Sequence, residues 1–398
     1  MNQTCLTCFK DFDLDEAHYR CVNKQCVERD EQLSDFLLGI DQVLGTVVIP
    51  EFPDTRPPEL RNGHQQLCPK CLNPTSVRLC PRCHAELPTY LEGVPGHIVY
   101  VLGPKGCGKS LYLIATFEHL EKRVFPTHLK SHFEFCTRHA KDKYKRLCDS
   151  VYRSGILLPA TRADRTDPEL LMPFIFHTRV KSYVPFFYPI SRRRSLNLAA
   201  FDTSGEDCEK LESLQWCCQG LPKSSALIIL IDPTSFPAIA AQLSTEAKTS
   251  IVDQVGNPKT VIDNITQYYR SSLGLPVQAK IPIPVALVLT KVDALKGLLD
   301  PASRIFDEAQ HRQGFDRVYC DHVSEDVRAF LRDERIGGHS IVAAVEANFS
   351  DHLFFAATSL GKPPRVEAGQ KRADNINPRN PENPWLWLLY RFGVLSEA

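Results

Sequence analysis

The chain has 398 residues, and its 47 Lys and Arg residues balance 47 Asp and Glu residues. This length suggests about two or three domains, and the balanced charge creates no field that favours nucleic acid or an anionic membrane. Apolar runs such as Ala226 to Ile231 are far shorter than the roughly 18 residues of a membrane span. The N-terminus shows no signal peptide, so we expect a cytoplasmic protein that does not enter a membrane.

The cysteines near the N-terminus have metal-type spacing. Eight of the 15 cysteines fall in pairs before residue 84, which favours reduced thiols and zinc over disulfides. Cys68-Pro-Lys-Cys71 and Cys80-Pro-Arg-Cys83 are two C-x-x-C knuckles, and two such knuckles can close one tetrahedral zinc site. His84 follows the second knuckle directly and is expected to lie beside the site or in solvent.

An earlier and less regular set suggests a second site. Cys5 and Cys8 form a C-x-x-C pair, whereas Cys21 and Cys26 are separated by four residues, and His18 is a possible substitute ligand. The sequence leaves open whether one zinc ion binds or two, and whether pairs from different ribbons share an ion.

Residues 1–92 are therefore predicted to form a double zinc-ribbon module. An acidic, amphipathic piece around Phe36 to Leu44 and a proline-rich connector, Pro50 to Pro58, lie between the cysteine pairs. Metal binding would supply most of the folding energy of such a ribbon, because it has few large apolar residues. We expect a rigid module for protein interaction, since no basic, aromatic-studded face favours nucleic acid.

A glycine-rich loop follows the apolar run Ile98 to Leu102 and precedes a helical pattern of Leu113, Phe117 and Leu120. Residues 103–110 read G-P-K-G-C-G-K-S, which matches the G-x-x-x-x-G-K-[ST] pattern of a phosphate-binding P-loop. Its backbone N–H groups and the helix N-terminus would bind the phosphates of a nucleoside triphosphate. The expected nucleotide-contacting residues of this loop are Gly103, Pro104, Lys105, Gly106, Cys107, Gly108, Lys109, Ser110 and Leu111.

Short buried strands separated by longer segments predict an α/β fold, a mostly parallel sheet with helices on both faces, over residues 93–398. A Lys- and Arg-rich insertion, about 119–160, interrupts this pattern and is expected to be a solvated helical segment. The C-terminal helix begins at Asn383-Pro384 and is expected to pack its apolar stripe on the domain's own sheet, a partner groove being the alternative. The predicted strands are Ile98 to Leu102, Phe174 to Val180, Leu196 to Phe201, Ala226 to Ile231, Pro284 to Leu289 and Leu353 to Thr358.

Polar motifs follow three of these strands. Asp202-x-x-Gly205 offers a carboxylate for Mg²⁺ and a glycine N–H for a γ-phosphate. Thr290-Lys291-Val292-Asp293 offers a carboxylate that can accept from the N1–H and 2-amino groups of guanine, neither of which adenine has. Lys291 can lie along the purine face. Thr358 and Ser359, after the last strand, are placed to meet the guanine oxygen through backbone N–H groups.

With these four motifs in this order, the chain resembles a Ras-like P-loop GTPase. Its zinc ribbons and its terminal N-P-W-L-W-L-L segment more narrowly resemble the bacterial double-GTPase family, of the type with an N-terminal zinc ribbon. The resemblance implies GTP and GDP as ligands and Mg²⁺ held by Ser110, Asp202 and a switch threonine. Thr161 is the first choice for that threonine, and Thr166 is its rival.

The narrower resemblance also implies a role in a bacterial conflict or defence system. We expect a slowly hydrolysing GTP switch, because the carboxylate of Glu206 is a poorer water-positioning group than an amide. A second GTPase, or other proteins of the system, would bind through the zinc module, the switches or the C-terminal helix. Catalytic roles fall to Lys109, to Thr161, and to two residues that depart from the Ras-like pattern, Glu206 and Lys105. Glu206 replaces a water-orienting Gln, and Lys105 could supply transition-state charge or point to solvent. The alternatives are a non-hydrolysing GTP-binding scaffold and a zinc-ribbon NTPase that binds nucleic acid.

Overall fold

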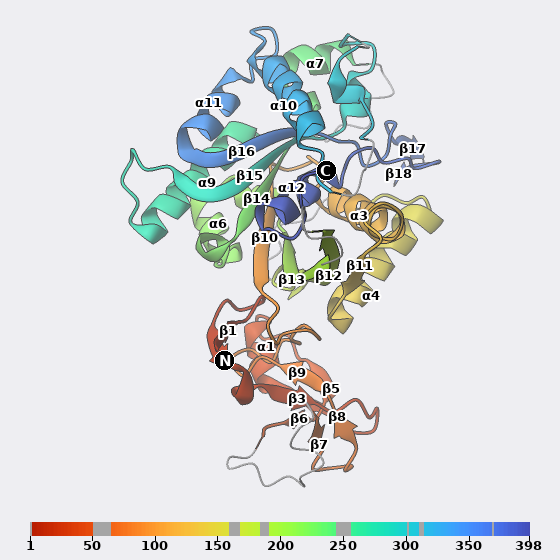
Figure 1. Ribbon diagram of the computed structural model, residues 1–398, viewed down its shortest axis with the longest axis vertical. Coiled ribbons are helices and arrows are strands. Elements are labelled where there is room, and N and C mark those ends of the chain that lie inside the picture. The colour runs from red at the N-terminus through yellow and green to blue at the C-terminus, as the bar shows by residue number, and fades with distance from the viewer. Residues whose placement is uncertain are drawn as a thin grey trace.

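A seven-stranded mixed sheet organises the chain, with β10 (Gly96–Leu102) near its centre (Figure 1). The computed structural model describes residues 2–50, 65–158, 168–183, 191–243, 256–300, 302–309, 314–367 and 370–398. The strand order is β11-β12-β13-β10-β14-β15-β16, in which the last five strands are parallel and β11 and β12 form an antiparallel edge. The other strands are β11 (His132–Phe135), β12 (Phe174–Tyr183), β13 (Ser191–Asp202), β14 (Ala226–Ile231), β15 (Ile281–Leu289) and β16 (Phe349–Ala356).

Helices cover both faces of the sheet, and successive side chains of a strand point to opposite faces, so each strand contributes to two apolar cores. In β10, Ile98, Tyr100 and Leu102 enter one apolar core, and Val99 and Val101 enter the other. The first core is built mainly with α6 (Leu211–Cys217), α9 (Pro258–Leu273), α10 (Arg317–Arg332) and α11 (His339–Asn348). The second is built mainly with α3 (Lys109–His119), α4 (Arg138–Cys148) and α12 (Asn383–Arg391).

Five of the predicted strands of the α/β domain lie within strands of the structure, whereas the sixth, Leu353 to Thr358, extends two residues beyond the end of β16, and β11 was not predicted. The basic insertion forms this edge strand together with α4 and two π-helical stretches, Leu120–His128 and Asp149–Arg153. It is therefore not simply solvated. Its aromatic side chains Phe133 and Tyr144 are buried around Phe117, while most of its cationic side chains stay at the surface.

The C-terminal segment returns across the domain. After a small hairpin, β17 (Arg365–Glu367) and β18 (Gln370–Arg372), it leads into α12, whose residues from Asn383 to Leu389 are buried. Trp385 is 1% exposed, and its ring centroid lies 5.9 Å from that of Phe117 and 5.8 Å from that of Phe176. The apolar stripe of this helix thus packs on the chain's own sheet.

The N-terminal module lies at the end of the sheet where β10 begins, away from the loop that follows β10 (Figure 1). Leu6 enters the first core of the α/β domain, the Phe9 ring lies 5.4 Å from that of Phe201, and the Phe9 carbonyl accepts from Lys223. Its elements are β1 (Asn2–Thr4), β2 (Asp11–Asp13), β3 (His18–Arg20), β4 (Val27–Arg29), α1 (Glu31–Phe36), β5 (Val43–Gly45), β6 (Val47–Val48), β7 (Gln66–Leu67), β8 (Pro74–Thr75) and β9 (Val77–Leu79).

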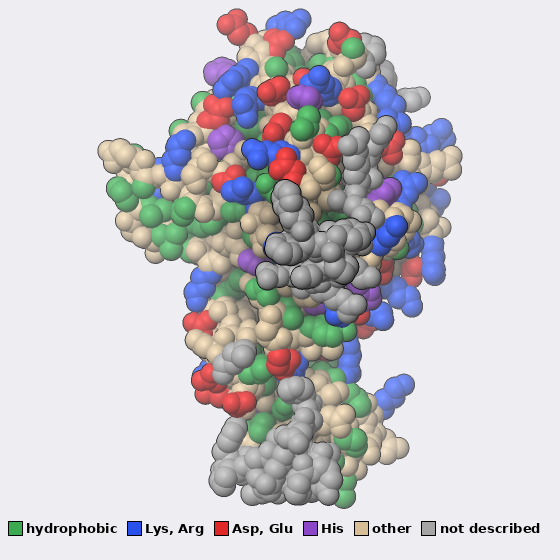
Figure 2. All heavy atoms as spheres, in the orientation of Figure 1, with side chains coloured by type: hydrophobic (Ala, Val, Ile, Leu, Met, Phe, Trp, Pro, Cys, Tyr) green, Lys and Arg blue, Asp and Glu red, His purple; other side chains and the backbone are tan. Residues whose placement is uncertain are grey.

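Acidic and basic side chains are interspersed over the face of the molecule seen in Figure 2. Within the described ranges, no helix has the length and apolar character needed to cross a membrane.

Truncating Trp385 tests the packing of α12. We expect Trp385→Ala to lower the free energy of unfolding by about 3–5 kcal/mol, because it leaves a large cavity between α12 and the sheet. Urea denaturation followed by circular dichroism measures this change. Val318→Ala is the control: Val318 is 63% exposed, so the expected change is within about 0.5 kcal/mol. Equal effects of the two substitutions would contradict the packing described for α12.

Candidate nucleotide and zinc sites

The glycine-rich loop turns at positions that only glycine adopts without strain. Gly106 and Gly108 have φ angles of 81° and 89°, and Gly108 directly precedes the first residue of α3. A Cβ atom on Gly103 would lie 2.8 Å from both the Cys107 Sγ and the Leu230 carbonyl oxygen. The loop thus places its backbone at the start of a helix, where N–H groups can bind an anion.

Lys109 is buried beneath this loop. Its ammonium group donates to the carbonyls of Gly103, at 2.8 Å, and Pro104, at 3.1 Å. Burial disfavours its charge, but Cys107, Cys208 and Asp202 together raise the pKa of Lys109 above its usual value. The Lys109 ammonium lies at the point where the loop would receive phosphates, and Ser110 and half-buried Leu111 continue the helix from it.

Asp202 ends β13 beside the loop and next to Ser110. Its carboxylate accepts from the Ser110 side chain, and burial raises its pKa. The buried Oδ1 of Asp202 has no hydrogen-bond partner among the described residues. A hydroxyl beside a carboxylate oxygen without a partner fits the needs of Mg²⁺, which prefers oxygen ligands and retains water molecules. Thr161 and Thr166, the candidate switch threonines, lie outside the described residues.

The Asp202-x-x-Gly205 segment contacts the glycine-rich loop directly. A Cβ atom on Gly205 would lie 2.5 Å from the backbone N and Cα of Lys105, so this approach requires glycine. The next residue, Glu206, forms an ion pair with the Lys105 ammonium, and Glu209 accepts from the Lys105 backbone N–H at 3.0 Å. Lys105 is thus paired with Glu206 instead of simply pointing to solvent.

The loop after β15 is hydrogen-bonded to the glycine-rich loop. The Thr290 hydroxyl lies 3.2 Å from the Cys107 carbonyl and 3.0 Å from the Ile231 carbonyl. Lys291, with a left-handed φ of 51°, donates to the Gly106 carbonyl at 2.8 Å and pairs with buried Asp232 at 2.5 Å. The structure therefore brings the predicted phosphate and base motifs into one site.

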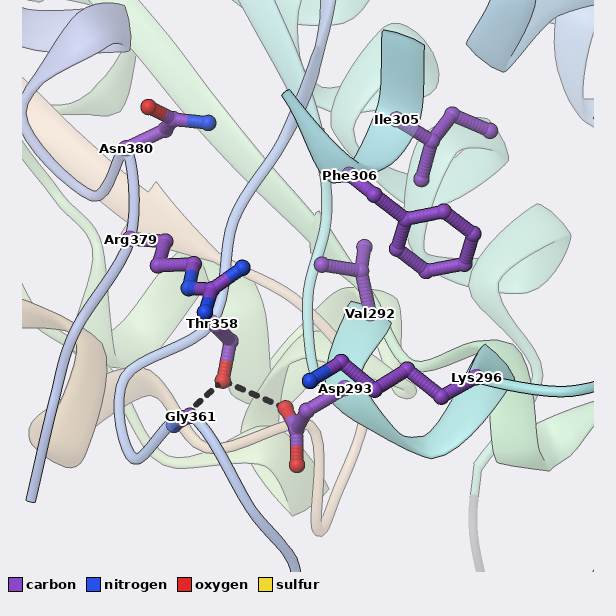
Figure 3. Close-up of a pocket in the computed structure, with 9 residues that line it drawn as sticks. All are labelled: Val292, Asp293, Lys296, Ile305, Phe306, Thr358, Gly361, Arg379 and Asn380. Carbon is purple, nitrogen blue, oxygen red and sulfur yellow. Dashed lines mark hydrogen bonds between the residues drawn. The ribbon is translucent and has the colours of Figure 1, made fainter. Parts of the chain in front are cut away.

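A pocket opens beside Asp293, bounded by loops that follow β15 and β16 (Figure 3). The Thr358 hydroxyl donates to Asp293 Oδ1 and accepts from the Gly361 N–H at 2.9 Å, and Ser359 is the next residue of that loop. The pKa of Asp293 lies above its usual value, because the effect of burial outweighs the lowering effect of the hydrogen bond from Thr358. The pocket is lined by Val292, Asp293, Lys296, Ile305, Phe306, Thr358, Gly361, Arg379 and Asn380.

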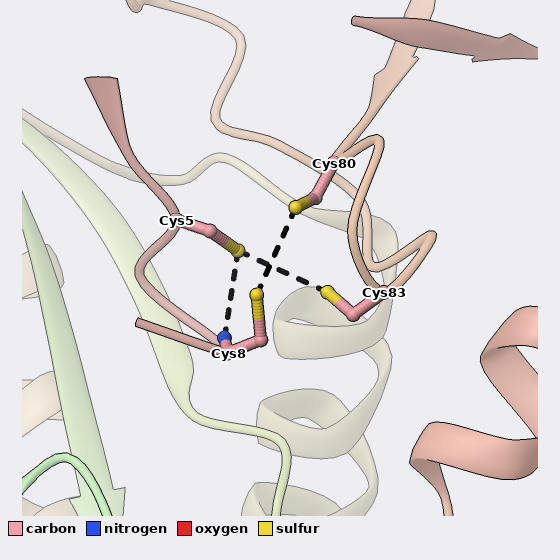
Figure 4. A group of neighbouring side chains, drawn as sticks. All are labelled: Cys5, Cys8, Cys80 and Cys83. Carbon is pink, nitrogen blue, oxygen red and sulfur yellow. Dashed lines mark hydrogen bonds between the residues drawn. The ribbon is translucent and has the colours of Figure 1, made fainter. Parts of the chain in front are cut away.

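The eight paired cysteines form two separate groups, and the first expected pairing was wrong. Neighbouring knuckles do not share a site. Instead, each group joins pairs from distant parts of the module, because β3 and β9 pair in antiparallel register and Cys21 and Cys80 therefore follow them at opposite ends. In each group the four sulfur atoms lie within 4.8 Å of one another, and Figure 4 shows those of the first group converging on one point. The groups are Cys5, Cys8, Cys80 and Cys83, and Cys21, Cys26, Cys68 and Cys71.

The sulfur separations fit tetrahedral zinc. Four sulfurs bound at about 2.3 Å lie about 3.8 Å from one another, and the measured separations are 3.9 Å for Cys5 and Cys83 and 3.8 Å for Cys8 and Cys80. In the second group, Cys21 and Cys71 lie 3.6 Å apart. Each group supplies four thiols, so both can close a structural zinc site without another ligand.

The two histidines have a different role from zinc binding. His18 is not a substitute ligand: its Nδ1 lies 2.9 Å from His84 Nε2. His84 is buried, and its Nδ1 lies 2.7 Å from Asp30 Oδ1. Arg20 donates to the other oxygen of Asp30 at 2.6 Å. This hydrogen-bonded chain of four polar residues satisfies buried charges within the module.

Sequence reasoning missed three residues of these sites. Asp232 holds Lys291, Asp30 orients His84, and Arg379 lines the pocket beside Asp293. Asp232 directly follows a predicted strand, and this position could have identified it from the sequence as a site residue. Asp30 and Arg379 lie outside any recognisable motif.

A glycine-rich loop between a buried strand and a helix, with a lysine at the helix start, defines this part of the chain as a P-loop α/β domain. No family model matches the chain, and the narrower resemblance to the zinc-ribbon double GTPases is not confirmed. Over 348 residues the chain is 27% identical to a protein of Mycolicibacterium smegmatis described as "Putative ESX-1 scaffolding and assembly protein SaeC". This similarity covers 82% of the chain and 83% of the relative.

Solved structures with similarity to the chain include P-loop GTPases. The Arl6 (BBS3) small GTPase of Trypanosoma brucei, with a bound nucleotide analogue, has a TM-score of 0.31 and 10% identity, over 76% of this chain and 99% of that one. Era of Aquifex aeolicus has a TM-score of 0.27 and 12% identity, over 77% of this chain and 58% of that one. At TM-scores this low, these likenesses assign no activity to the chain.

The division of the cysteines into two groups predicts how the zinc content responds to double substitutions. Cys68→Ser with Cys80→Ser disrupts one ligand in each group, so we expect the zinc content to fall from two ions per chain towards none. Cys21→Ser with Cys68→Ser disrupts one group only, so one ion should remain. Elemental analysis of purified protein by mass spectrometry measures both. The reverse pattern would mean that neighbouring knuckles share an ion, contrary to the structure.

Proposed function

We propose that the chain is a Mg²⁺-dependent GTP-binding protein that hydrolyses GTP and acts as a molecular switch. The observation that carries this proposal is the Asp293 carboxylate, which is hydrogen-bonded to Thr358 in a pocket and belongs to a loop that contacts the P-loop. A carboxylate accepts hydrogen bonds only. It therefore complements the N1–H and 2-amino donors of guanine and has no matching donors on adenine.

The P-loop residues would hold the phosphates. On binding, the Lys109 ammonium would exchange its contacts with the Gly103 and Pro104 carbonyls for phosphate oxygens. Ser110 and Asp202 would hold Mg²⁺, which neutralises charge on the β- and γ-phosphates during transfer. The reaction is the attack of water on the γ-phosphorus, which breaks the bond to the β-phosphate oxygen and releases GDP and phosphate.

The Lys105–Glu206 ion pair would govern the rate of hydrolysis. The pair spans the P-loop and the segment after Asp202, and both side chains are partly exposed, at 34% and 43%. While paired, Lys105 is not available to the γ-phosphate, and Glu206 brings negative charge next to it. Both effects favour slow intrinsic turnover.

Exchange of the base-reading carboxylate tests guanine specificity. We expect Asp293→Asn to weaken GDP binding by about 10- to 150-fold, the range for losing a hydrogen bond to a charged group, and to favour xanthine nucleotides. Equilibrium titration with GDP, XDP and ADP measures this. Asp263→Asn, on the exposed face of α9, is the matched control and should leave all three affinities unchanged. Equal affinity of the unsubstituted protein for ADP and GDP would refute the proposal.

A scaffold that binds GTP without hydrolysing it is the second candidate function. It is favoured by the Lys105–Glu206 pair, which occupies both candidate catalytic side chains, and by the words "scaffolding and assembly" in the name of the M. smegmatis relative. In either case the zinc module, which lies away from the P-loop, is the proposed surface for protein partners. A second GTPase of a bacterial conflict or defence system is one such partner.

Single-turnover hydrolysis separates the switch from the scaffold. For a switch, we expect Glu206→Gln to raise the rate several-fold, because the neutral amide can orient water and no longer retains Lys105. Lys105→Ala should lower the rate of the Gln variant if the freed ammonium stabilises the transition state. Rates that stay at the background value of the Lys109→Ala protein in every variant would favour the scaffold.

A further inference from the structure

The segment that leads into α12 forms one wall of the pocket beside Asp293, which we call the base pocket. Arg379 exchanges two backbone hydrogen bonds with Thr358, with N···O distances of 2.9 Å and 3.1 Å, and Asn377 donates to the Leu360 carbonyl at 3.0 Å. Arg379 is thereby held beside the residue that binds Asp293. Figure 3 shows its guanidinium group near Thr358, whereas the Asn380 side chain points away.

This segment is fixed on its other side as well. The Asn380 amide donates to the Asp307 carbonyl at 2.7 Å, and its oxygen accepts from the Ala309 N–H at 2.9 Å. The Pro381 carbonyl accepts from Thr116, and Glu382, fully buried, lies 2.6 Å from His119 Nδ1. The last two contacts join the segment to α3, the helix that begins in the P-loop, so Arg379 has a rigid backbone position.

The pocket has few side-chain donors that are not already engaged. Among the lining residues, the Thr358 hydroxyl donates to Asp293 and the Asn380 amide donates to the Asp307 carbonyl. The guanidinium of half-buried Arg379, by contrast, makes no hydrogen bond or ion pair with any described residue. Lys296 also lines the pocket, but it belongs to the same loop as Asp293, and its charge lowers the pKa of that carboxyl.

We propose that Arg379 binds the O6 and N7 edge of the guanine base, a role that rests on the GTP-binding function proposed above. Guanine has donors at N1 and its 2-amino group and acceptors at O6 and N7, and an arginine fork can donate to both acceptors. Asp293 matches the donors and Arg379 matches the acceptors. The C-terminal segment thus contributes directly to nucleotide specificity.

The test compares GDP with 7-deaza-GDP, which lacks the N7 acceptor. We expect the unsubstituted protein to prefer GDP by about tenfold or more, the value of a hydrogen bond from a charged donor. In Arg379→Ala this preference should fall to near one, and GDP affinity should drop by about 5- to 150-fold, the range for one bidentate base contact. Isothermal titration measures all four affinities.

Two controls locate the effect. Lys296→Ala should retain the preference for GDP over 7-deaza-GDP, and Arg379→Ala should retain the preference for GDP over IDP, which lacks the 2-amino group read by Asp293. A folded Arg379→Ala protein with an unchanged 7-deaza ratio would overturn this role for Arg379, whatever its GDP affinity. If Asp293→Asn still shifts binding towards xanthine nucleotides, the proposed GTP-binding function stands even though the role of Arg379 does not. Absence of guanine preference in the unsubstituted protein would instead refute that function.

Discussion

Two neighbouring side chains connect the phosphate loop to the base pocket, and the geometry of the whole site depends on them. The Thr290 hydroxyl and the Lys291 ammonium contact the carbonyls of Cys107 and Gly106, two consecutive residues of the glycine-rich loop. Because both side chains leave the end of β15, the sheet sets the distance between phosphate and base. A nucleotide that fills both ends would therefore meet a preformed frame, with little ordering of the loops required.

The core of the fold could be predicted because its signals are local. Each buried parallel strand is a short apolar run, and the P-loop, Asp202 and Asp293 stand directly after such runs. β11 could not be predicted, because its sequence, His-Phe-Glu-Phe, lies within a basic stretch, and both its pairing with β12 and the burial of Phe133 depend on residues distant in the chain. The Lys105–Glu206 pair and the approach of Arg379 to Thr358 join residues far apart in the chain, and no local pattern records them.

The same limit explains the error in the zinc module. Spacing identifies C-x-x-C knuckles because a tight turn alone aims two thiols at one point. Which knuckles share an ion depends on how the strands pair, and β3 lies between β6 and β9, which are distant in sequence. The cysteines that could bind metal were therefore predictable from the sequence, whereas their division into two groups depends on the fold. The groups are Cys5–Cys8 with Cys80–Cys83, and Cys21–Cys26 with Cys68–Cys71.

The division of the cysteines into two groups also affects the order in which the groups would bind metal as the module folds. The two metal groups are nested: Cys21 and Cys71 are 50 residues apart, inside the 78 residues between Cys5 and Cys83. Closing a loop costs conformational entropy that grows with its length. Closing the inner group first shortens the loop that the outer group must still close. During synthesis the outer group also has to wait until residue 83 has left the ribosome. We therefore expect the inner ion to bind first and the outer ion to complete the module.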